Sequence, residues 1–314
     1  ADRIPDLRVE VNAERLGAAA NVARCIETAR GRWIKPVFQD DLIDPGCLTT
    51  MRAARRRGVP VVVAARRYRY EGEVPDWQRD ACEHLLEASL VHRFGGGHLD
   101  RDRVAAVAAE TVVQRVPQLN FVGEPMAVLL DRTALLDAGG LDTRYVQLWD
   151  YEIVVRLAMR RGLVLVAEPQ ATFRVHAGSE TSRNLGGSAF GINVLDRLRI
   201  QVAYATDPVY RPVRRAADRL DPPVELTVPA LGVARAARRI AEELPEDERP
   251  DATAAVEELA AALPAEVPEG VPSPWEADNA ETAMLMELSD RELPPHLAEM
   301  IAAARAEAAA EAAT

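Results

Sequence analysis

The chain is expected to be an α/β protein, with a mostly parallel sheet flanked by helices and an α-helical extension at its C-terminal end. Two observations predict this fold. Strand-like and helix-like segments alternate over the first 200 residues, a pattern typical of a parallel sheet covered by helices. After about residue 200, Ala, Glu, Arg and Pro dominate and the patterns become helical. We therefore expect an α/β domain over residues 1–200 and an acidic, Ala/Glu-rich helical extension over residues 201–314.

The expected strands are short apolar runs bounded by turn residues. They cover residues 7–11, 33–39, 59–64, 121–130, 163–167 and 172–175. The helices expected between them cover residues 18–29, 48–57, 102–115, 132–138 and 150–161. The last of these helices is amphipathic, and its apolar face consists of Ile153, Val154, Leu157 and Ala158. Helices of the extension are expected at residues 231–244, 251–263 and 293–312. A Pro/Glu-rich break at residues 263–275 is expected to be loosely ordered.

Charge is unevenly distributed along the chain. The formal net charge is −11; residues 1–200 hold 28 Lys and Arg against 26 Asp and Glu, whereas residues 201–314 hold 10 against 23. Proteins that bind nucleic acid usually present a basic stripe, so the acidic extension argues against a nucleic-acid partner. The arginine runs at residues 55–57 and 66–67 are interpreted as solvated faces. Contact with a membrane surface or an anionic acceptor is the alternative for these runs.

The cysteines and the apolar runs indicate the compartment. Cys25, Cys47 and Cys82 show no CxxC spacing, and we interpret them as reduced, apolar residues of a cytosolic protein. No apolar run reaches the length of a membrane span, and no signal peptide is visible. The expected location is the cytoplasm. A peripheral position at the inner face of the membrane, or self-association, through the C-terminal helices stays open as an alternative.

Two adjacent carboxylates follow the second expected strand. The apolar run from Trp33 ends at Asp40 and Asp41, and Asp44 with Pro45 then marks a turn. In α/β proteins, ligands bind outside the carboxyl ends of the strands. Two carboxylates at this place suit a hard divalent cation that carries substrate phosphates. A solvated Asp-Asp loop is the structural alternative.

Four segments, taken in order, resemble motifs of the family-2 glycosyltransferases, which are inverting enzymes with the GT-A fold. The first holds Asn12, Gly17 and Asn21. The second runs from Trp33 to Pro45, and Gln39, Asp40 and Asp41 are similar to the DXD-type metal motif of the family. The third covers residues 121–125 and 132–142, with Gly123, Glu124 and Pro125 in its loop. The fourth holds Trp149, Asp150, Tyr151, Glu152 and Arg156, followed by Phe173, Arg174, Val175, His176 and Ser179. Together the segments cover about residues 1–185.

The resemblance implies a GT-A-like domain that is incomplete at its N-terminal end. Members of the family begin with a strand, a helix and a second strand that hold much of the nucleotide. These elements have no counterpart before Ala1, and the first strand expected here resembles the third strand of the family. We therefore expect the domain to lack the N-terminal donor-binding strand and helix, with truncation of a longer enzyme as the explanation.

The resemblance also implies a metal and residues that hold it. Asp41 is expected to bind Mg²⁺ or Mn²⁺ directly, and His176 could complete the ligand shell of the metal. Asp40 is expected to face the ribose or a metal-bound water, because successive residues that leave a strand point in different directions. A loop histidine that bonds to the backbone is the alternative for His176.

Asp150 matches the catalytic base of the family, which takes the proton from the acceptor hydroxyl. An N-cap at the start of the helix is the alternative for this residue. Glu152 is the nearest competitor for the role of base. Arg156 is expected to pair with Glu152, because residues four apart share a helix face.

Other residues resemble substrate contacts of the family. Gly17 and Asn21 are similar to contacts on the donor side, and helix entry and capping are their structural alternatives. Gly123, Glu124 and Trp149 are expected beside the acceptor, where a tryptophan could stack on a sugar ring. An exposed turn carboxylate is the alternative for Glu124, and a core aromatic residue is the alternative for Trp149.

The implied function is metal-dependent, inverting transfer of a sugar from a nucleotide-diphosphate donor to a hydroxyl of a carbohydrate or lipid-linked acceptor. Synthesis of a cell-surface polysaccharide or glycoconjugate is the expected setting. A hypothesis from another class is a non-catalytic carbohydrate- or protein-binding remnant of such a domain. Metal-dependent nucleotidyl transfer or phosphate hydrolysis also uses a carboxylate pair, but no P-loop accompanies the pair in this sequence.

Overall fold

The computed structural model describes residues 7–74, 76–113, 120–176, 194–242 and 244–265. Its strands are β1 (Trp33–Ile34), β2 (Leu42–Ile43), β3 (Val61–Tyr70), β4 (Gly97–Leu99), β5 (Val128–Asp131) and β6 (Leu163–Val175). Its α-helices are α1 (Ala18–Thr28), α2 (Cys47–Ala54), α3 (Asp76–Glu87), α4 (Leu90–Phe94), α5 (Arg101–Val113), α6 (Arg132–Asp137), α7 (Trp149–Arg161), α9 (Asp196–Thr206), α10 (Arg211–Ala217), α11 (Thr227–Glu242) and α12 (Arg249–Ala260). Short 3₁₀ helices are η1 (Pro125–Ala127) and η3 (Pro208–Tyr210). Ser179, the expected helix at 293–312 and most of the expected break at 263–275 lie outside the described residues.

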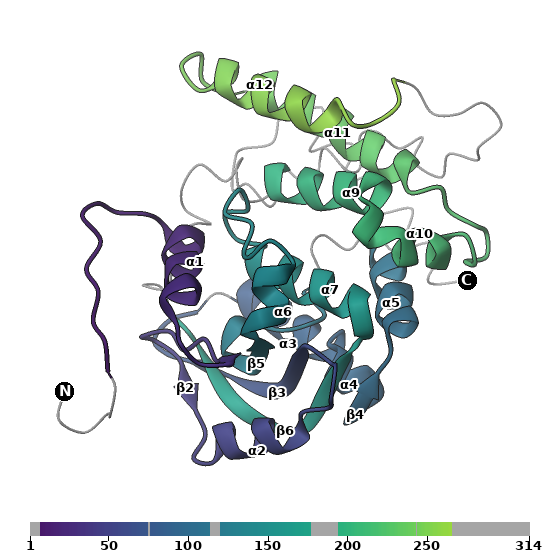
Figure 1. The fold of residues 1–314 in the computed structure, drawn as a ribbon. Helices are drawn as coiled ribbons and strands as arrows, with labels where there is room; N and C mark the ends of the chain where they lie inside the picture. Colours follow the sequence, from purple (N-terminus) through teal and green to yellow (C-terminus); the bar gives the residue numbers. More distant parts are fainter. Residues whose placement is uncertain (1–6, 75, 114–119, 177–193, 243, 266–314) are drawn as a thin grey trace.

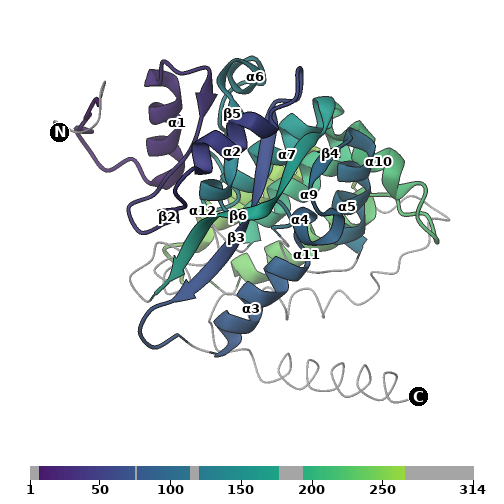
Figure 2. The ribbon, with the colours of Figure 1, turned by 90° about the horizontal axis from the view of Figure 1, so that it is seen from below.

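The sheet is mixed, and a long parallel pair forms its centre. Its strand order is β1-β5-β3-β6-β2, and β4 also pairs with β6. β3 and β6 run parallel from the Val62–Val164 pair to the Tyr70–Val175 pair (Figure 2), whereas each of the other described pairings is antiparallel. The α/β class is therefore as expected, but a mostly parallel sheet is not what the described strands form. The two outer strands, β1 and β2, are two residues long, and each pairs antiparallel with its longer neighbour.

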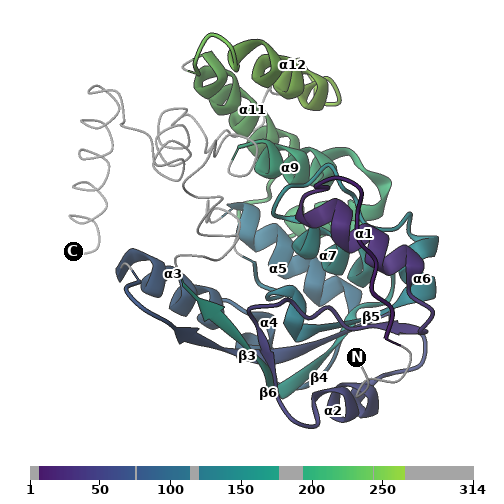
Figure 3. The same cartoon turned by 90° about the vertical axis from the view of Figure 1, so that its left-hand side faces the viewer.

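Helices cover both faces of the sheet, and alternate side chains of β3 point into the two apolar clusters that result. Val62 and Ala64 face α2, in a cluster that also contains Met51. Val61 and Val63 face the opposite side, where α5 and α7 contribute to the main core. Figure 3 shows these tiers, with α2 under the sheet, α1, α5, α6 and α7 over it, and α9, α11 and α12 further out.

The C-terminal helices belong to the same core as the sheet. Buried residues of α9, α10, α11 and α12 join those of α5 and α7 in one apolar cluster. Figure 1 shows α9, α10, α11 and α12 stacked above α7. Tyr204 on α9 and Tyr210 in η3 are among the largest fully buried side chains. The expected boundary at residue 200 falls inside α9 (Asp196–Thr206). No helix in the described part of the chain is both long enough and apolar enough to cross a bilayer.

Most expected helices are present, whereas several expected strands differ. The expected strand at 7–11 is wrong, because Val9 and Val11 are 78% and 86% exposed and no strand pairs with them among the described residues. Only Trp33–Ile34 of the run at 33–39 is a strand, since Pro36 follows and lacks a backbone N–H. The run at 121–130 becomes a loop, then η1, and then β5.

The two closing strands expected at 163–167 and 172–175 are one continuous strand, β6. Pro169 lies inside it. The pairing with β3 shifts register between Ala64 and Arg66, opposite this proline, so the irregularity is absorbed locally. The face of α7 that was expected to be apolar is buried, as Ile153, Val154, Leu157 and Ala158 are at most 2% exposed.

Candidate active site at the carboxyl ends of the parallel strands

The parallel pair β3 and β6 ends at one edge of the sheet, and His176 follows directly after β6. His176 Nε2 lies 3.6 Å from Asp40 Oδ2, so the imidazole and the carboxylate meet although they are far apart in sequence. Arg174 fixes this contact from the strand, since its Nε donates to the backbone oxygen of Asp40. Arg174 also forms an ion pair with Glu71, in which Arg174 Nη1 lies 3.3 Å from Glu71 Oε2. The edge therefore brings the loop of Asp40 onto the end of β6.

Asp41 is the buried member of the carboxylate pair. It is only 8% exposed, and its Oδ1 has no hydrogen-bond partner among the described residues. Burial, with the neighbouring charge of Asp40, raises the pKa of Asp41 to about 6. Lys35 lies near it, and its Nζ donates to the backbone oxygen of Met126. Burial lowers the pKa of Lys35 to about 8, against the opposing charges of Cys47 and Asp41. Asp41 is thus a carboxylate with one oxygen still to be satisfied.

Glu124 lies in the loop before η1 and is held by two side chains of β3. Arg66 forms an ion pair with Glu124 and is itself only 6% exposed. The hydroxyl of Tyr68 donates to Glu124 Oε1. Gly123 has φ +98°, and a side chain at this position would approach Arg66 Nη1 to 3.1 Å, so the close packing of the loop requires glycine. The interpretation of residues 66–67 as a solvated face is therefore wrong for Arg66, whereas Arg67 is half-exposed and pairs with Asp44.

Asp150 lies in the first turn of α7, with its side chain partly exposed. Burial of the carboxyl group raises the pKa of Asp150 to about 7, against a 2.7 Å hydrogen bond from the backbone N–H of Tyr151. The charge of Glu124 raises it further. The N-cap position of α7 is Leu148, so Asp150 is not the cap that the alternative interpretation required.

The two acidic segments converge through an aromatic contact and through Glu124. Phe38, just before Asp40, packs edge-on against Trp149, just before Asp150, with ring centroids 6.3 Å apart. Glu124 raises the pKa of both Asp41 and Asp150, so each of these carboxyl groups lies within its electrostatic reach. We refer to Asp41, Glu124 and Asp150, which lie on these neighbouring segments, as the acidic site. Trp149 is 8% exposed, so its ring is largely buried against Phe38.

Glu152, the competitor of Asp150, is committed to other contacts. It is 4% exposed and pairs with Arg156 at 2.6 Å, as the spacing of four residues predicted. The hydroxyl of Tyr210 donates to the same oxygen at 2.8 Å. Arg156 also donates to the backbone oxygens of Ala138 and Gly140. Glu152 thus ties α7 to its neighbours and is poorly placed to accept a proton from a substrate.

Gly17 and Asn21 lie at the start of α1 and are not joined to the acidic residues by any described contact. Asn21 is exposed, and its Oδ1 accepts a 2.9 Å hydrogen bond from Asn12 Nδ2. Gly17 is the N-cap residue of α1 with φ +79°, and open space surrounds the position that a side chain would take. Gly17 and Asn21 thus lie at a helix start, where the described polar contact of Asn21 is with Asn12.

Asp196 is a site-supporting residue that the sequence did not reveal. Its carboxylate is fully buried and accepts hydrogen bonds from the backbone N–H groups of Val146, Gln147 and Leu148, at 2.7–3.0 Å. These residues lead directly into α7 and Asp150. Nothing in the sequence indicated that its partners lie about fifty residues earlier.

No group of three or more His, Cys, Asp or Glu side chains able to hold a metal occurs among the residues that the structure describes. The chemistry of the donors nevertheless suits a divalent cation that takes its other ligands from phosphate or water. Asp40 and Asp41 supply carboxylate oxygens, His176 supplies an imidazole nitrogen, and Asp41 Oδ1 is buried without a partner in the described part of the chain. A cation at this place would satisfy that oxygen.

No protein-family model matches this chain. A curated relative, named Uncharacterized protein MT1568, comes from Mycobacterium tuberculosis (strain CDC 1551 / Oshkosh). It is 34% identical over 212 residues, which cover 65% of this chain and 60% of the relative. The chain therefore spans about 60% of the length of this relative. The name of this relative states no activity.

Proposed function

We propose that this chain is the glycosyltransferase domain, or part of it, of a metal-dependent inverting enzyme of the GT-A type. It would move a sugar from a nucleotide-diphosphate donor to a hydroxyl of a carbohydrate or lipid-linked acceptor. The packing of Phe38 against Trp149, which brings the segment of Asp40 and Asp41 next to the start of α7, supports the proposal most strongly, together with the Asp40–His176 contact. A cytoplasmic setting and a role in cell-surface polysaccharide or glycoconjugate synthesis are part of the same proposal.

Asp150 is the proposed catalytic base. An acceptor hydroxyl attacks the anomeric carbon of the donor sugar, its proton passes to the Asp150 carboxylate, and the bond from the anomeric carbon to the diphosphate oxygen breaks. A base works best when its pKa lies near the working pH, and burial places the pKa of Asp150 at about 7. The start of α7 holds this carboxylate in place, and the buried ring of Trp149 limits the access of water beside it.

Asp40, Asp41 and His176 are the residues that would hold Mg²⁺ or Mn²⁺. When bound, the cation supplies positive charge to the leaving diphosphate. Asp41 would contribute the oxygen that lacks a partner among the described residues, and Asp40 would be oriented by Arg174, which binds its backbone oxygen. Gly17 and Asn21 are proposed as contacts on the donor side, as the resemblance implies.

Gly123, Glu124 and Trp149 are proposed to bind the acceptor. Arg66 and Tyr68, both on β3, hold the Glu124 carboxylate in one orientation. The direction from which its oxygens can accept a further hydrogen bond is therefore fixed. A fixed carboxylate can orient a sugar hydroxyl with little loss of side-chain entropy on binding. The close packing at Gly123 keeps this loop against the sheet.

The proposal predicts that donor binding and turnover can be separated by mutation. Calorimetric titration with UDP-, GDP- and dTDP-sugars in Mn²⁺ should detect binding of one of them. Asp41→Ala should weaken this binding at least about tenfold, because it removes a cation ligand. Asp150→Asn should bind the donor normally and lose transfer by roughly a hundredfold or more, because general-base catalysis contributes that much. Release of the nucleoside diphosphate in the presence of acceptor mixtures measures the transfer.

Asp44→Asn is the matched control, since Asp44 is also an aspartate of this loop but pairs with Arg67 on the exposed side of β3. Its donor affinity and turnover should equal those of the wild type, and all three variants should keep a cooperative thermal transition. Full turnover in Asp150→Asn would remove this residue as the base. No affinity for any nucleotide sugar would instead favour a non-catalytic binding module.

A further inference from the structure

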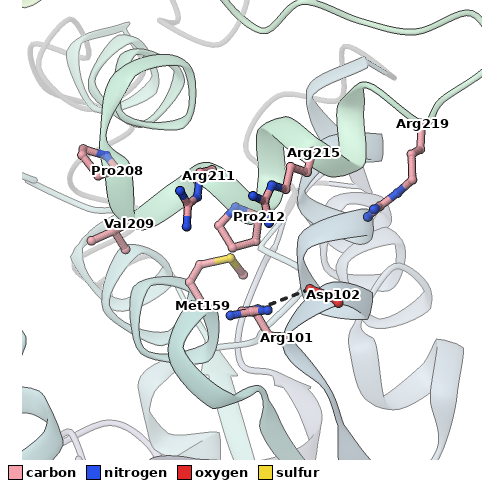
Figure 4. Close-up of a pocket in the computed structure, with 9 residues that line it drawn as sticks. All are labelled: Arg101, Asp102, Met159, Pro208, Val209, Arg211, Pro212, Arg215 and Arg219. Atoms are coloured by element: carbon pink, nitrogen blue, oxygen red, sulfur yellow. Dashed lines mark hydrogen bonds and ion pairs between the residues drawn. The ribbon is translucent and has the colours of Figure 1, made fainter.

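A pocket near the C-terminal end of α7 is rimmed by arginines. It has a volume of about 260 Å³ and lies between the start of α5, the end of α7 and the segment of η3 and α10 (Figure 4). Its lining consists of Arg101, Asp102, Met159, Pro208, Val209, Arg211, Pro212, Arg215 and Arg219. Met159 follows Asp150 by nine residues on α7, which separates the pocket from the acidic site by about 14 Å along the helix.

The charge of this pocket is strongly positive although the C-terminal part of the chain is acidic. Arg211, Arg215 and Arg219 recur every four residues, so they share one face of α10 and its continuation. All three are exposed, and none of them forms an ion pair with a described residue. Arg101 approaches from α5, and its Nε lies 3.3 Å from the lone carboxylate of the lining, Asp102. The pocket therefore presents four guanidinium groups against one carboxylate.

The arrangement suits a small, multiply charged oxyanion. A guanidinium donates in a planar fork that matches phosphate, and a phosphate group offers enough oxygens for several forks at once. A ligand with a single carboxylate could accept from only one or two of the guanidinium groups. The floor of the pocket is apolar, with Met159 buried beneath Pro212. A carbon group attached to the phosphate could lie on this floor.

The size of the pocket limits the ligand further. A volume of 260 Å³ corresponds to roughly nine water molecules, at about 30 Å³ each. This volume lies just below the range of about 300–1,000 Å³ that is typical of small-molecule sites. A phosphate or diphosphate group with a short attached chain fits this volume, whereas a whole nucleotide sugar does not.

We propose that this arginine pocket binds the phosphate group of a phosphomonoester or diphosphate ligand. The ligand can be a soluble phosphorylated compound or the headgroup of an anionic lipid, because the recognised chemistry is the same. The proposal is independent of the proposed transferase activity. It concerns a different end of α7 and requires neither the carboxylates of the acidic site nor a divalent cation.

The first experiment is calorimetric titration of the chain with inorganic pyrophosphate in the absence of divalent cations. Binding should be detected, and it should weaken as salt is added. Arg211→Gln/Arg215→Gln should weaken the affinity at least about tenfold, because two charge-assisted forks are lost. Arg211→Lys/Arg215→Lys should also weaken it, but less, since the charge remains while the fork is lost. Asp102→Asn should strengthen it, because the carboxylate of the lining is removed.

Arg56→Gln/Arg57→Gln is the matched control, as it removes the same charge from exposed arginines outside the pocket. It should leave the affinity for pyrophosphate unchanged. Asp41→Asn should also leave it unchanged, which distinguishes this pocket from the acidic site. The second experiment is cosedimentation with phosphatidylcholine vesicles with or without phosphatidic acid, and it identifies a lipid source.

Dependence on Arg211 and Arg215 in either experiment supports the proposal and assigns the source of the ligand. Absence of binding to both pyrophosphate and phosphatidic acid would overturn it. Equal losses of affinity in Arg56→Gln/Arg57→Gln and in Arg211→Gln/Arg215→Gln would also overturn it, because binding would then depend only on the net charge of the protein. Unchanged thermal transitions of the variants exclude unfolding as the cause of a loss.

Discussion

The buried carboxyl group of Asp41 lowers the stability of the folded state. Its side chain is 8% exposed, and one oxygen has no hydrogen-bond partner within the described residues. A buried carboxylate is destabilised unless it is bonded or paired, which is why its pKa rises to about 6. A residue kept under such conditions is more readily explained by ligand binding than by packing.

Replacement of Asp41 by asparagine should therefore stabilise the free protein at high pH. The folded-state pKa of about 6 lies above the ordinary value of 3.8, so the ionised form is disfavoured in the fold. The favourable contribution of this group is complete below pH 3.8 and is lost as the pH rises through 6. Relative to the wild type, Asp41→Asn should gain on the order of 3 kcal/mol in unfolding free energy at pH 8, and little near pH 4. Urea unfolding across this range measures the difference.

Asp247→Asn is a suitable control, because Asp247 is an exposed aspartate in the turn before α12. Its unfolding free energy should stay within about 0.5 kcal/mol of the wild type at each pH. If Asp41→Asn were destabilising at pH 8, the carboxylate would have a stabilising partner within the protein, and its assignment as a cation ligand would fail.

Single residues of the site differed in how well the sequence revealed them. The acidic residues stood out because their spacing resembles a family pattern. Arg66 did not stand out, because together with Arg67 it resembles a charged run on the surface. Along β3 these two side chains point to opposite faces, so Arg66 reaches Glu124 while Arg67 reaches Asp44. This division follows from strand alternation, but only once β3 is known to extend beyond Ala64.

At the scale of elements, the position of α7 depends on a contact from the C-terminal helices. Asp196, at the start of α9, binds the backbone N–H groups of Val146, Gln147 and Leu148, just before α7 begins. Tyr204 on the same helix exchanges a 2.7 Å hydrogen bond with Tyr151 on α7. The helix that carries Asp150 is thus held in place on both sides of that residue.

Asp196→Asn should loosen this support. An amide offers one accepting oxygen, and its NH₂ group would face backbone donors, so at least one buried N–H loses its partner. The expected cost is about 3 kcal/mol in unfolding free energy, measured by urea denaturation, together with faster hydrogen exchange at residues 146–148.

Asp207→Asn supplies the comparison for this prediction. Asp207 caps η3 through Val209 N–H, and asparagine caps a helix start as well as aspartate does. Its stability should therefore match that of the wild type. Equal stability of Asp196→Asn and Asp207→Asn would show that Asp196 does not hold the segment before α7.

At the scale of the whole molecule, local patterns predicted the helices better than the sheet. The apolar face of α7 can be read from one stretch of sequence, because its period is that of a helix. The partners of β3 cannot, since the antiparallel pairing with β5 and the parallel pairing with β6 depend on segments more than sixty residues away. The change of composition near residue 200 suggested a separate extension, but α9 and η3 place tyrosines against α7.

The shared core predicts that residues 1–200 will not fold alone. A chain that ends at residue 200 is cut within α9 and loses Tyr204, Tyr210 and the buried face of α10, leaving apolar surface of α5 and α7 exposed. We expect this fragment to bind ANS and to unfold without a cooperative transition, whereas the full chain unfolds cooperatively. Calorimetry and near-UV circular dichroism measure both. A fragment that keeps the near-UV spectrum and a sharp transition would establish residues 1–200 as an autonomous domain, with the later helices as an appendage.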